Sequence, residues 1–496
     1  MSTLLKFFLL GILFIFLGLY YLFNTASGDQ HLRNFASHTL SQKSGLNVVV
    51  TSIDLNQYPE IVIKMQIEKK AKITLTGTLT LISLDMDYTL ISECIVTDIC
   101  EIDDNIHVNG RVNGSYSRMV IQGEGEALDG NVTYHFIKFT DKVEDLSLLL
   151  RKVNSTKLFT LMGYHELFKG KADIDVHFKL MEKDNRQGSF VYDVKDSNIS
   201  GLPFHLHAEV KIDGVQHTFH SHISSPFMKL DIQEGHYNQD KKLAKANYTL
   251  DIQDLSHFEP LLGYTYLGPF YATGEMLYNN HLIITGHSQS FKGMLDYFFE
   301  KDGLYVDLDD VSYKKFMEIF PFPSMLSANV RGHLYYNFIE KTLVLNANLY
   351  HAKVIHRTLV KNLHRKSTVN LKKETFQQSR MDASYHDGLL VGDLRLENKQ
   401  GHLYLNQLAI DFDESSIDTY FDVKLQDQEF AGEIYGSLED PKVNLQLQKL
   451  IKYQMSKQMN DVMGEDVSKA ISQLPMEGMA KGMAAGATAS FLKVCF

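Results

Sequence analysis

The sequence contains no tryptophan among its 496 residues, and cysteine, proline and glycine are also scarce. Its three cysteines, Cys94, Cys100 and Cys495, are too few for a disulfide-dense scaffold or a four-cysteine zinc site. With 9 prolines, 32 glycines and 44% apolar residues, low-complexity disorder is excluded for most of the chain. An excess of basic residues is missing too, because 49 Lys and Arg stand against 60 Asp and Glu, and this balance disfavours a nucleic-acid partner.

Catalytic signatures are missing as well. The sequence contains no GxSxG motif, no HExxH motif, no phosphate-binding loop and no dinucleotide fingerprint. It therefore predicts a protein that is not an enzyme and that uses no cofactor.

One long uncharged run is present, from Phe7 to Phe23. Its length is close to the roughly 20 residues that a helix needs to cross a bilayer, and Lys6 before it favours a cytoplasmic N-terminus. We expect residues 1–28 to be an uncleaved transmembrane signal anchor. A cleaved signal peptide is the alternative, but the run is long and Thr25-Ala26-Ser27 is a poor cleavage site.

Apolar and polar residues alternate along most of the remaining chain, most clearly over residues 73–81, 172–178 and 342–349. This period of two predicts strands with one apolar and one polar face. Dipeptides typical of hairpin turns separate the strands: Asp129-Gly130, Asp213-Gly214, Asn279-Asn280, Asp302-Gly303 and Asp387-Gly388. The pattern predicts a mainly β fold, a long antiparallel meander covered on one side only.

A triplet of an Asp or Asn, an apolar residue and Ser recurs at intervals of 53, 56 and 56 residues, beginning at Asp145, Asn198, Asp254 and Asp310. Such triplets are common helix caps, and three of the four precede a short apolar stretch that we expect to be helical. The spacing predicts a body, residues 29–443, built from stacked strand-rich repeats with short helices.

The character of the chain changes in residues 444–496. Apolar residues recur every four positions, which predicts an amphipathic helix with a methionine-rich stripe that Pro475 ends. A Gly, Ala and Met-rich tail follows. The helix either packs against the last strands, which we favour, or caps the open edge of the one-sided sheet, docks on a partner or touches the outer membrane.

Several of these features together resemble the bacterial AsmA-like family, which includes TamB- and YhdP-type proteins. They are the run Gly28–Leu32 after the anchor, the strand Leu46–Ile53, the repeats, and the closing segment Gly436–Val443. The resemblance implies an inner-membrane-anchored periplasmic protein with a β-taco groove. It also implies that the apolar groove carries phospholipid acyl chains between the inner and outer membranes. The alternative is an envelope scaffold that aids outer-membrane protein biogenesis through the C-terminal segment, with an outer-membrane protein as partner.

The alternation itself selects the residues that would line such a groove. The candidates are Phe204, Leu206, Val210, Ile212, Phe219, Ile223, Leu343, Leu345 and Leu349. Packing of these residues against a second sheet in an ordinary sandwich is the alternative interpretation.

Histidines gather around one predicted hairpin. If Asp213-Gly214 forms a two-residue turn, His207 faces His220 and His205 faces His222. Neighbouring imidazoles of this kind are a weak candidate for a Zn²⁺ or Cu²⁺ site, and a solvated polar face is the favoured interpretation.

A basic stretch and a cysteine pair complete the candidates. Lys353, Arg357, Lys361 and Arg365 follow each other at intervals of four, as in a basic amphipathic helix that binds anionic headgroups. A solvated face or loop is the favoured alternative. A Cys94–Cys100 disulfide needs the chain to turn between these residues, since a straight strand would hold them about 20 Å apart.

Overall fold

The computed structural model describes residues 26–445, apart from 69, 97–100, 162, 164–168, 184, 200, 263, 322, 368 and 427. The expected transmembrane run and the expected C-terminal helix therefore lie outside the described residues. Within residues 26–445, no helix combines the length and the apolar character that crossing a bilayer requires.

The described chain divides into two compact units, which we describe separately. Unit 1 contains the residues up to Ile199 and from Pro203 to Phe219, and unit 2 contains most of the rest, from His220 onward. Both units are built mainly of antiparallel strands, which confirms the mainly β, antiparallel part of the expected fold class. The predicted body over residues 29–443 stays a prediction.

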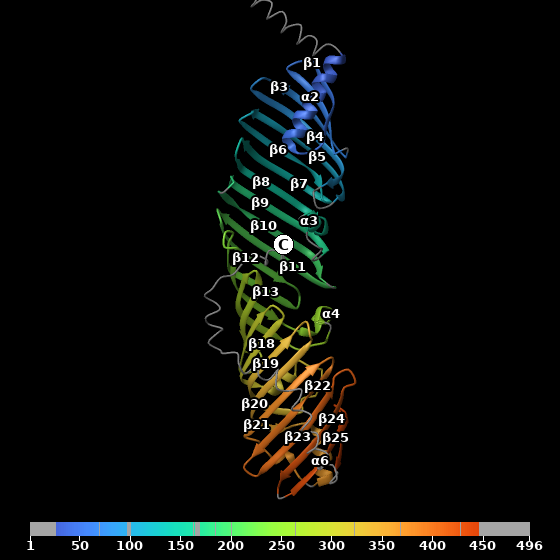
Figure 1. Cartoon of the computed structure of the whole chain (residues 1–496), viewed down its shortest axis with the longest axis vertical. Helices are drawn as coiled ribbons and strands as arrows, with labels where there is room; N and C mark the ends of the chain where they lie inside the picture. Colours follow the sequence, from blue (N-terminus) through green and yellow to red (C-terminus); the bar gives the residue numbers. More distant parts are fainter. Residues whose placement is uncertain are drawn as a thin grey trace, which may run out of the picture. The chain divides into compact units, whose positions relative to one another are not determined.

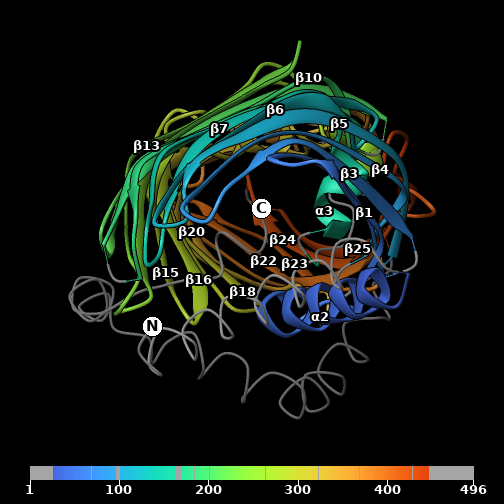
Figure 2. The same cartoon turned by 90° about the horizontal axis from the view of Figure 1, so that it is seen from above.

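Unit 1 is a meander in which each strand from β1 to β10 pairs with the next (Figure 1). Its elements are α2 (Ala26–Ser44), β1 (Val48–Gln57), β2 (Glu60–Ile67), β3 (Ala71–Leu79), β4 (Ser83–Val96), β5 (Glu101–Ser115), β6 (Arg118–Ala127), β7 (Gly130–Phe139), β8 (Val143–Asn154), α3 (Ser155–Leu161), β9 (Lys169–Met181), β10 (Arg186–Ile199) and β11 (Leu202–Asp213). The strands bend around α3, which lies on their concave side (Figure 2).

Unit 2 begins within β12 (Gln216–Ser224) and continues the same pattern, each strand from β13 to β26 pairing with the next. Its first elements are β13 (Met228–Asn238), β14 (Leu243–Ile252), the 3₁₀ turn η1 (Leu255–Phe258), α4 (Glu259–Leu262), β15 (Phe270–Asn279), β16 (His281–Ser288), β17 (Met294–Glu300), β18 (Gly303–Ser312) and α5 (Tyr313–Met317). The others are β19 (Leu326–Asn337), β20 (Thr342–Val354), α6 (Arg357–Ser367), η2 (Leu371–Lys373), β21 (Gln378–His386), β22 (Leu389–Asn398), β23 (Gly401–Asp411), β24 (Ser416–Leu425), β25 (Gln428–Ser437) and β26 (Lys442–Leu445).

The helical connections all follow even-numbered strands. In unit 2 they come after β14, β18 and β20, and in unit 1 α3 comes after β8. Because neighbouring strands are antiparallel, the even-numbered strands of a unit run in one direction and end at the same edge of the sheet. Each unit therefore has a helix edge, where these connections lie, and an opposite hairpin edge.

Helix α2 closes the free edge of the first strand. Arg33, Ser37 and Ser41 are spaced four residues apart, so they lie on one face of the helix. Ser37 accepts a hydrogen bond from the Val50 N–H at 2.8 Å, and Ser41 accepts one from the Val48 N–H at 3.0 Å. The serine hydroxyls of α2 thus pair with β1 N–H groups that an uncovered edge strand would leave free to bond another chain.

The repeated triplets have mixed outcomes. Asp254 caps η1 by accepting a hydrogen bond from the Ser256 N–H at 3.0 Å, and Ser312 of the last triplet caps α5. The expectation for the first triplet is wrong, because Asp145 lies within β8 and α3 begins ten residues later, capped by Asn154. Asp145 and Asp310 instead occupy strand irregularities with φ of +49° and +57°.

Candidate functional site

The sheet of unit 1 carries an unbroken apolar row on one face. Residues directly opposite one another, one from each strand from β1 to β10, form this middle row. In strand order they are Ile53, Ile63, Leu75, Tyr88, Gly110, Gly123, Tyr134, Leu148, Val176 and Phe190. No member carries a charge, and every member is half-buried. Residues of the opposite face are mostly polar and include the Arg111–Asp85 pair, which forms two hydrogen bonds of 2.8 and 2.7 Å.

A second apolar row of unit 1 runs parallel to the first, nearer the helix edge. Its members in β5 and β7–β10 are buried: Val108, Val132, Leu150, Ile174 and Tyr192. Helix α3 covers this side with Leu158 and Phe159, which are themselves buried. Exposure of the apolar face therefore increases from the helix edge to the middle row, so the face is covered on one side and partly open on the other.

Unit 2 repeats this arrangement over more strands. Its middle row contains Ile232, Tyr248, Gly274, Gly286, Tyr297, Val306, Leu334, Leu345, Ala383, Gly392 and Leu408, from β13 to β23. The row beside it on the hairpin side contains Met276, Ile284, Phe299, Leu304, Tyr336, Leu343, Tyr385, Leu390 and Ile410. All nine residues of this hairpin-side row are half-buried. We call the apolar faces of the two units the inner face.

Two tyrosines span a glycine pair in each middle row. In unit 1, the Tyr88 and Tyr134 hydroxyls hydrogen bond to each other, and Gly110 and Gly123 lie opposite one another on the strands between them. A Cβ added at Gly123 would approach both tyrosine hydroxyls to 2.8 Å. The hydrogen bond lets polar hydroxyls remain on an apolar face, and burial together with this bond raises the pKa of Tyr88.

Unit 2 has the same device. The Tyr248 and Tyr297 hydroxyls hydrogen bond to each other over Gly274 and Gly286. Tyr134 and Tyr297 are 163 residues apart, about three times the 53 to 56-residue interval of the triplets. This match between the two spacings supports an internal repeat. The residues that recur in equivalent positions are the two tyrosines and two glycines rather than the triplet.

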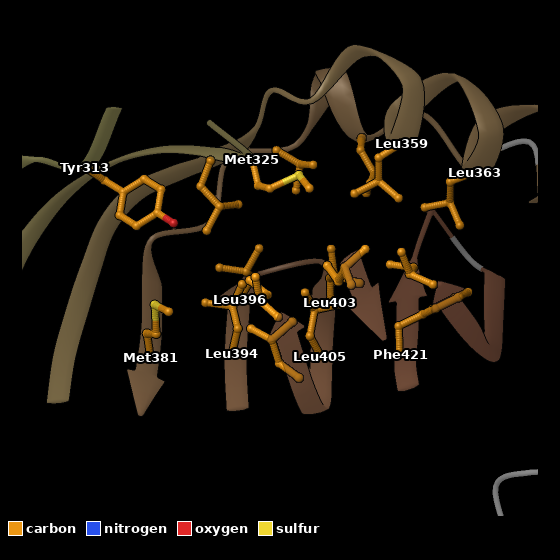
Figure 3. A pocket seen from close by; sticks show the side chains of 17 residues that line it. Tyr313, Met325, Leu359, Leu363, Met381, Leu394, Leu396, Leu403, Leu405 and Phe421 are labelled. Carbon is orange, nitrogen blue, oxygen red and sulfur yellow. The ribbon is translucent and has the colours of Figure 1, made fainter. Parts of the chain in front are cut away.

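The inner face of unit 2 has a pocket beneath α6. The helix and the sheet enclose about 750 Å³ of space, part of which is open to solvent. Leu359 and Leu363 of α6 point toward Leu394, Leu396, Leu403, Leu405 and Phe421 of the sheet (Figure 3). Of the 17 lining residues, Tyr313 alone has an ionisable side chain, and burial raises its pKa to about 12. The pocket can therefore hold an apolar group but offers no charged residue for acid–base chemistry.

A strand bulge explains how β23 supplies four residues to this pocket. Leu403 and Leu405 have odd numbers, whereas Leu408 and Ile410 have even numbers, yet all four line the pocket. The register shifts between Asn406 and Ala409, and Gln407 has φ of +53°. The Gln407 N–H donates to the Asp393 carboxylate at 3.0 Å. Because of the bulge, Leu408 and Ile410 lie on the inner face, whereas strict alternation would place them on the opposite face.

The predicted lining residues fall into two groups. Leu343 and Leu345 lie in the apolar rows of unit 2, and Leu349 is only 1% exposed within its core. In β11 and β12, Phe204 and Leu206 are buried, while Val210, Ile212, Phe219 and Ile223 are half-buried. The alternation of apolar and polar residues did not identify Leu408 and Ile410, which follow the bulge. It also missed both tyrosine bridges, which depend on contacts between distant strands.

The basic stretch is a helix for most of its length. Arg357, Lys361 and Arg365 lie on α6 and are exposed, while Leu359, Val360 and Leu363 are buried on its other side. Lys353 is not helical, which corrects the expectation. It is the penultimate residue of β20, where alternate burial of Ala352 and Val354 continues the strand.

The expected turn of the histidine hairpin is displaced by one residue. Residues Gly214 and Val215 form the turn, rather than Asp213 and Gly214, because Gly214 has φ of +57° and Asp213 still belongs to β11. His205 and His207 both contact Asp193, at 2.8 and 3.5 Å, whereas His222 contacts Asp231 at 2.5 Å and His220 is also exposed on β12. Over the described ranges, no three His, Cys, Asp or Glu side chains are grouped to hold a metal ion.

The cysteine pair lies at a hairpin. Val96 pairs with Glu101, so the chain does turn between β4 and β5. Cys94 is buried and lies opposite Asp103. Cys100 is outside the described residues, so the Cys94–Cys100 disulfide stays a prediction.

Comparison with known proteins adds no relative to this geometry, since no family model, no curated protein and no solved structure matches the chain.

Proposed function

We propose that this protein is a membrane-anchored periplasmic lipid-binding protein whose inner face carries phospholipid acyl chains between the inner and outer membranes. The observation that supports this most is the uninterrupted apolar middle row in each unit, through ten strands in unit 1 and eleven in unit 2. The middle row of unit 1 and the hairpin-side row of unit 2 are half-buried throughout. Soluble proteins rarely leave an extended apolar surface partly exposed unless something binds there.

The length of the rows suits a path better than a single site. Ten strands spaced about 4.8 Å apart span roughly 43 Å, whereas the hydrocarbon of one bilayer leaflet is about 15 Å deep. One acyl chain therefore covers only part of a row. Each buried CH₂ contributes about 0.8 kcal/mol wherever it lies, so a uniform apolar row holds chains firmly without fixing their position.

Neighbouring residues of one strand provide a matched test. Leu148 lies in the middle row of unit 1, and Leu149 points to the opposite face, although both are half-buried leucines. Leu343 and Val344 form the same kind of pair in β20. Photo-crosslinking residues placed at each of the four positions in the full chain report which face touches lipid in cells.

We expect phospholipid adducts, identified by mass spectrometry, at positions 148 and 343 and few at 149 and 344. Equal adduct formation on both faces, or none at either inner position, would overturn the proposal. Extraction of the purified chain gives a second measurement, since co-purifying phospholipid is expected.

A further inference from the structure

The exposed side of α6 carries a concentrated positive charge. Arg357, Lys361, His364 and Arg365 are exposed on this helix, and Lys353, Lys372 and Lys373 are exposed beside it in sequence. The segment from Lys353 to Lys373 contains no Asp or Glu, although the whole chain has a net charge of −11. We call the six Lys and Arg residues of this set the α6 patch.

The cations of the α6 patch have no acidic partner among the residues that the structure describes. Among the described residues, no member of the patch forms an ion pair, in contrast to Arg111 with Asp85 or Lys157 with Asp104. The nearest acidic residue in sequence, Glu374, is 4% exposed and hydrogen bonds to Asn398 and Gln426. Lys366 of the same helix is not part of the patch, since its ammonium group donates a hydrogen bond to the Val443 carbonyl of β26.

The other side of α6 fixes the orientation of this charge. Leu359, Val360 and Leu363 are buried against the sheet, and Leu359 and Leu363 form one wall of the apolar pocket. Asn362 and Lys366 bond to the backbone of the β25–β26 segment at Pro441 and Val443. The helix is therefore held in place, and its cations project outward from a fixed base.

We propose that the α6 patch docks unit 2 onto the anionic headgroup surface of a lipid bilayer. Arg357, Lys361 and Arg365 span about 12 Å along the helix at 1.5 Å per residue, which is an extended array rather than a cradle for one phosphate. A plane of anionic headgroups can contact such an array at several points, and each Lys or Arg near that plane strengthens binding about fivefold.

This inference rests on the proposed function in one respect. The same helix separates the bilayer-facing cations from the apolar pocket, so docking would bring the pocket beside the lipid that it exchanges. The two proposals have different readouts, because headgroup docking is measured by vesicle binding, and acyl-chain binding by the lipid that co-purifies.

The test uses the full chain held in phosphatidylcholine nanodiscs and mixed with vesicles of phosphatidylcholine containing 0 to 40% phosphatidylglycerol. The patch variant is R357Q/K361Q/R365Q. The matched control is K229Q/K301Q/K399Q, which removes the same charge from three exposed lysines outside the α6 patch. Circular dichroism and thermal unfolding establish that both variants fold like the parent chain.

We expect the parent chain and the control to float with anionic vesicles, to ignore neutral ones, and to dissociate at high salt. The patch variant should bind about 100-fold more weakly while retaining its co-purifying phospholipid. Equal loss in the control would show a general charge effect and overturn the inference. Binding of a soluble polyanion such as polyphosphate without vesicle binding would also overturn it.

Discussion

The hydroxyls of Tyr88 and Tyr134 are hydrogen bonded although two strands separate the residues. The rings can meet because the positions between them, Gly110 and Gly123, have no side chains. Glycine within a strand normally weakens a sheet, but aromatic rings that cover the bare backbone offset this loss. The Tyr88 hydroxyl also donates to the Gln122 carbonyl at 3.3 Å, and Tyr248 makes the equivalent contact with Thr285.

Gly123→Ala should therefore destabilise unit 1 by about 1–3 kcal/mol, because the new methyl group collides with both rings. Urea unfolding followed by circular dichroism measures the effect. Thr133→Val, on the opposite face of the next strand, keeps a β-branched side chain and should change stability by less than about 0.5 kcal/mol. Equal stability of Gly123→Ala and the parent would show that the rings have room to move.

The tyrosine bridges also predict alkaline sensitivity. Burial and the bond to its partner raise the pKa of Tyr88 and of Tyr248, so the folded state retains these protons at a pH where the unfolded state has lost them. The stability they contribute is complete below pH 10 and decreases as the pH rises above that value. The double variant Tyr88→Phe/Tyr248→Phe should show a smaller loss between pH 9 and 11. An unchanged pH profile would contradict this assignment.

The buried ion pair beneath α3 is a second stabilising contact. Lys157 lies 2.9 Å from Asp104, whose side chain is 1% exposed, and 2.7 Å from Asp129. Lys157→Met leaves the Asp104 carboxylate without its cation, and we expect a loss of about 3 kcal/mol or more. Asp104→Asn in the same chain should recover much of this loss, because the amide oxygen still accepts from the Leu128 N–H. A double-mutant cycle in urea measures the coupling, and additive effects would argue against it.

His356 makes α6 sensitive to acid. Its Nδ1 accepts a hydrogen bond from the Leu359 N–H at 3.2 Å, which requires the neutral ring, and burial lowers its pKa below the usual value despite the opposing effect of Asp440. Stability is therefore complete above about pH 6.5 and decreases as the pH falls toward the lower folded pKa. Hydrogen exchange of α6 amides at pH 5 and 7.5 tests this. His356→Asn keeps an acceptor and should remove most of the pH difference; persistence of that difference would assign it to another group.

Charge on the inner face should prevent lipid binding. Leu148→Glu and Leu343→Glu place a carboxylate in half-buried apolar rows, where an acyl chain would have to desolvate it. We expect at least a tenfold loss of co-purifying phospholipid from either variant. Leu149→Glu and Val344→Glu, on the opposite face of the same strands, should bind lipid normally. Loss in all four variants would indicate a folding defect rather than a lipid contact.

Local pattern predicts the strands well but not all of the turns. The alternation over 73–81, 172–178 and 342–349 corresponds to β3, β9 and β20, and Asp387-Gly388 forms the β21–β22 turn. At Asp129-Gly130 the turn lies one residue earlier. Leu128 and Asp129 both adopt positive φ there, because the Asp104 carboxylate binds the Leu128 N–H and Lys157 binds Asp129. These contacts join residues about 25 positions apart, beyond the reach of a local pattern.

The inner face is predictable in kind but not in extent. The alternating pattern correctly places Leu343 and Leu345 on one apolar face, since successive side chains of a strand point to opposite faces of the sheet. It fails after a bulge, as at Gln407, and it cannot show which strands bring Tyr88 and Tyr134 together. The position of α6 over its pocket likewise depends on long-range contacts with the β25–β26 segment.

The placement of every helical connection after an even-numbered strand restricts how such a chain can change its length. Insertion of a single strand would reverse the direction of all later strands and move their helices to the hairpin edge. Insertion of a hairpin preserves both direction and edge, and it lengthens every apolar row by two residues, or about 10 Å. Relatives of this protein should therefore differ in length by whole hairpins, and the length of their apolar rows should change by two strands at a time.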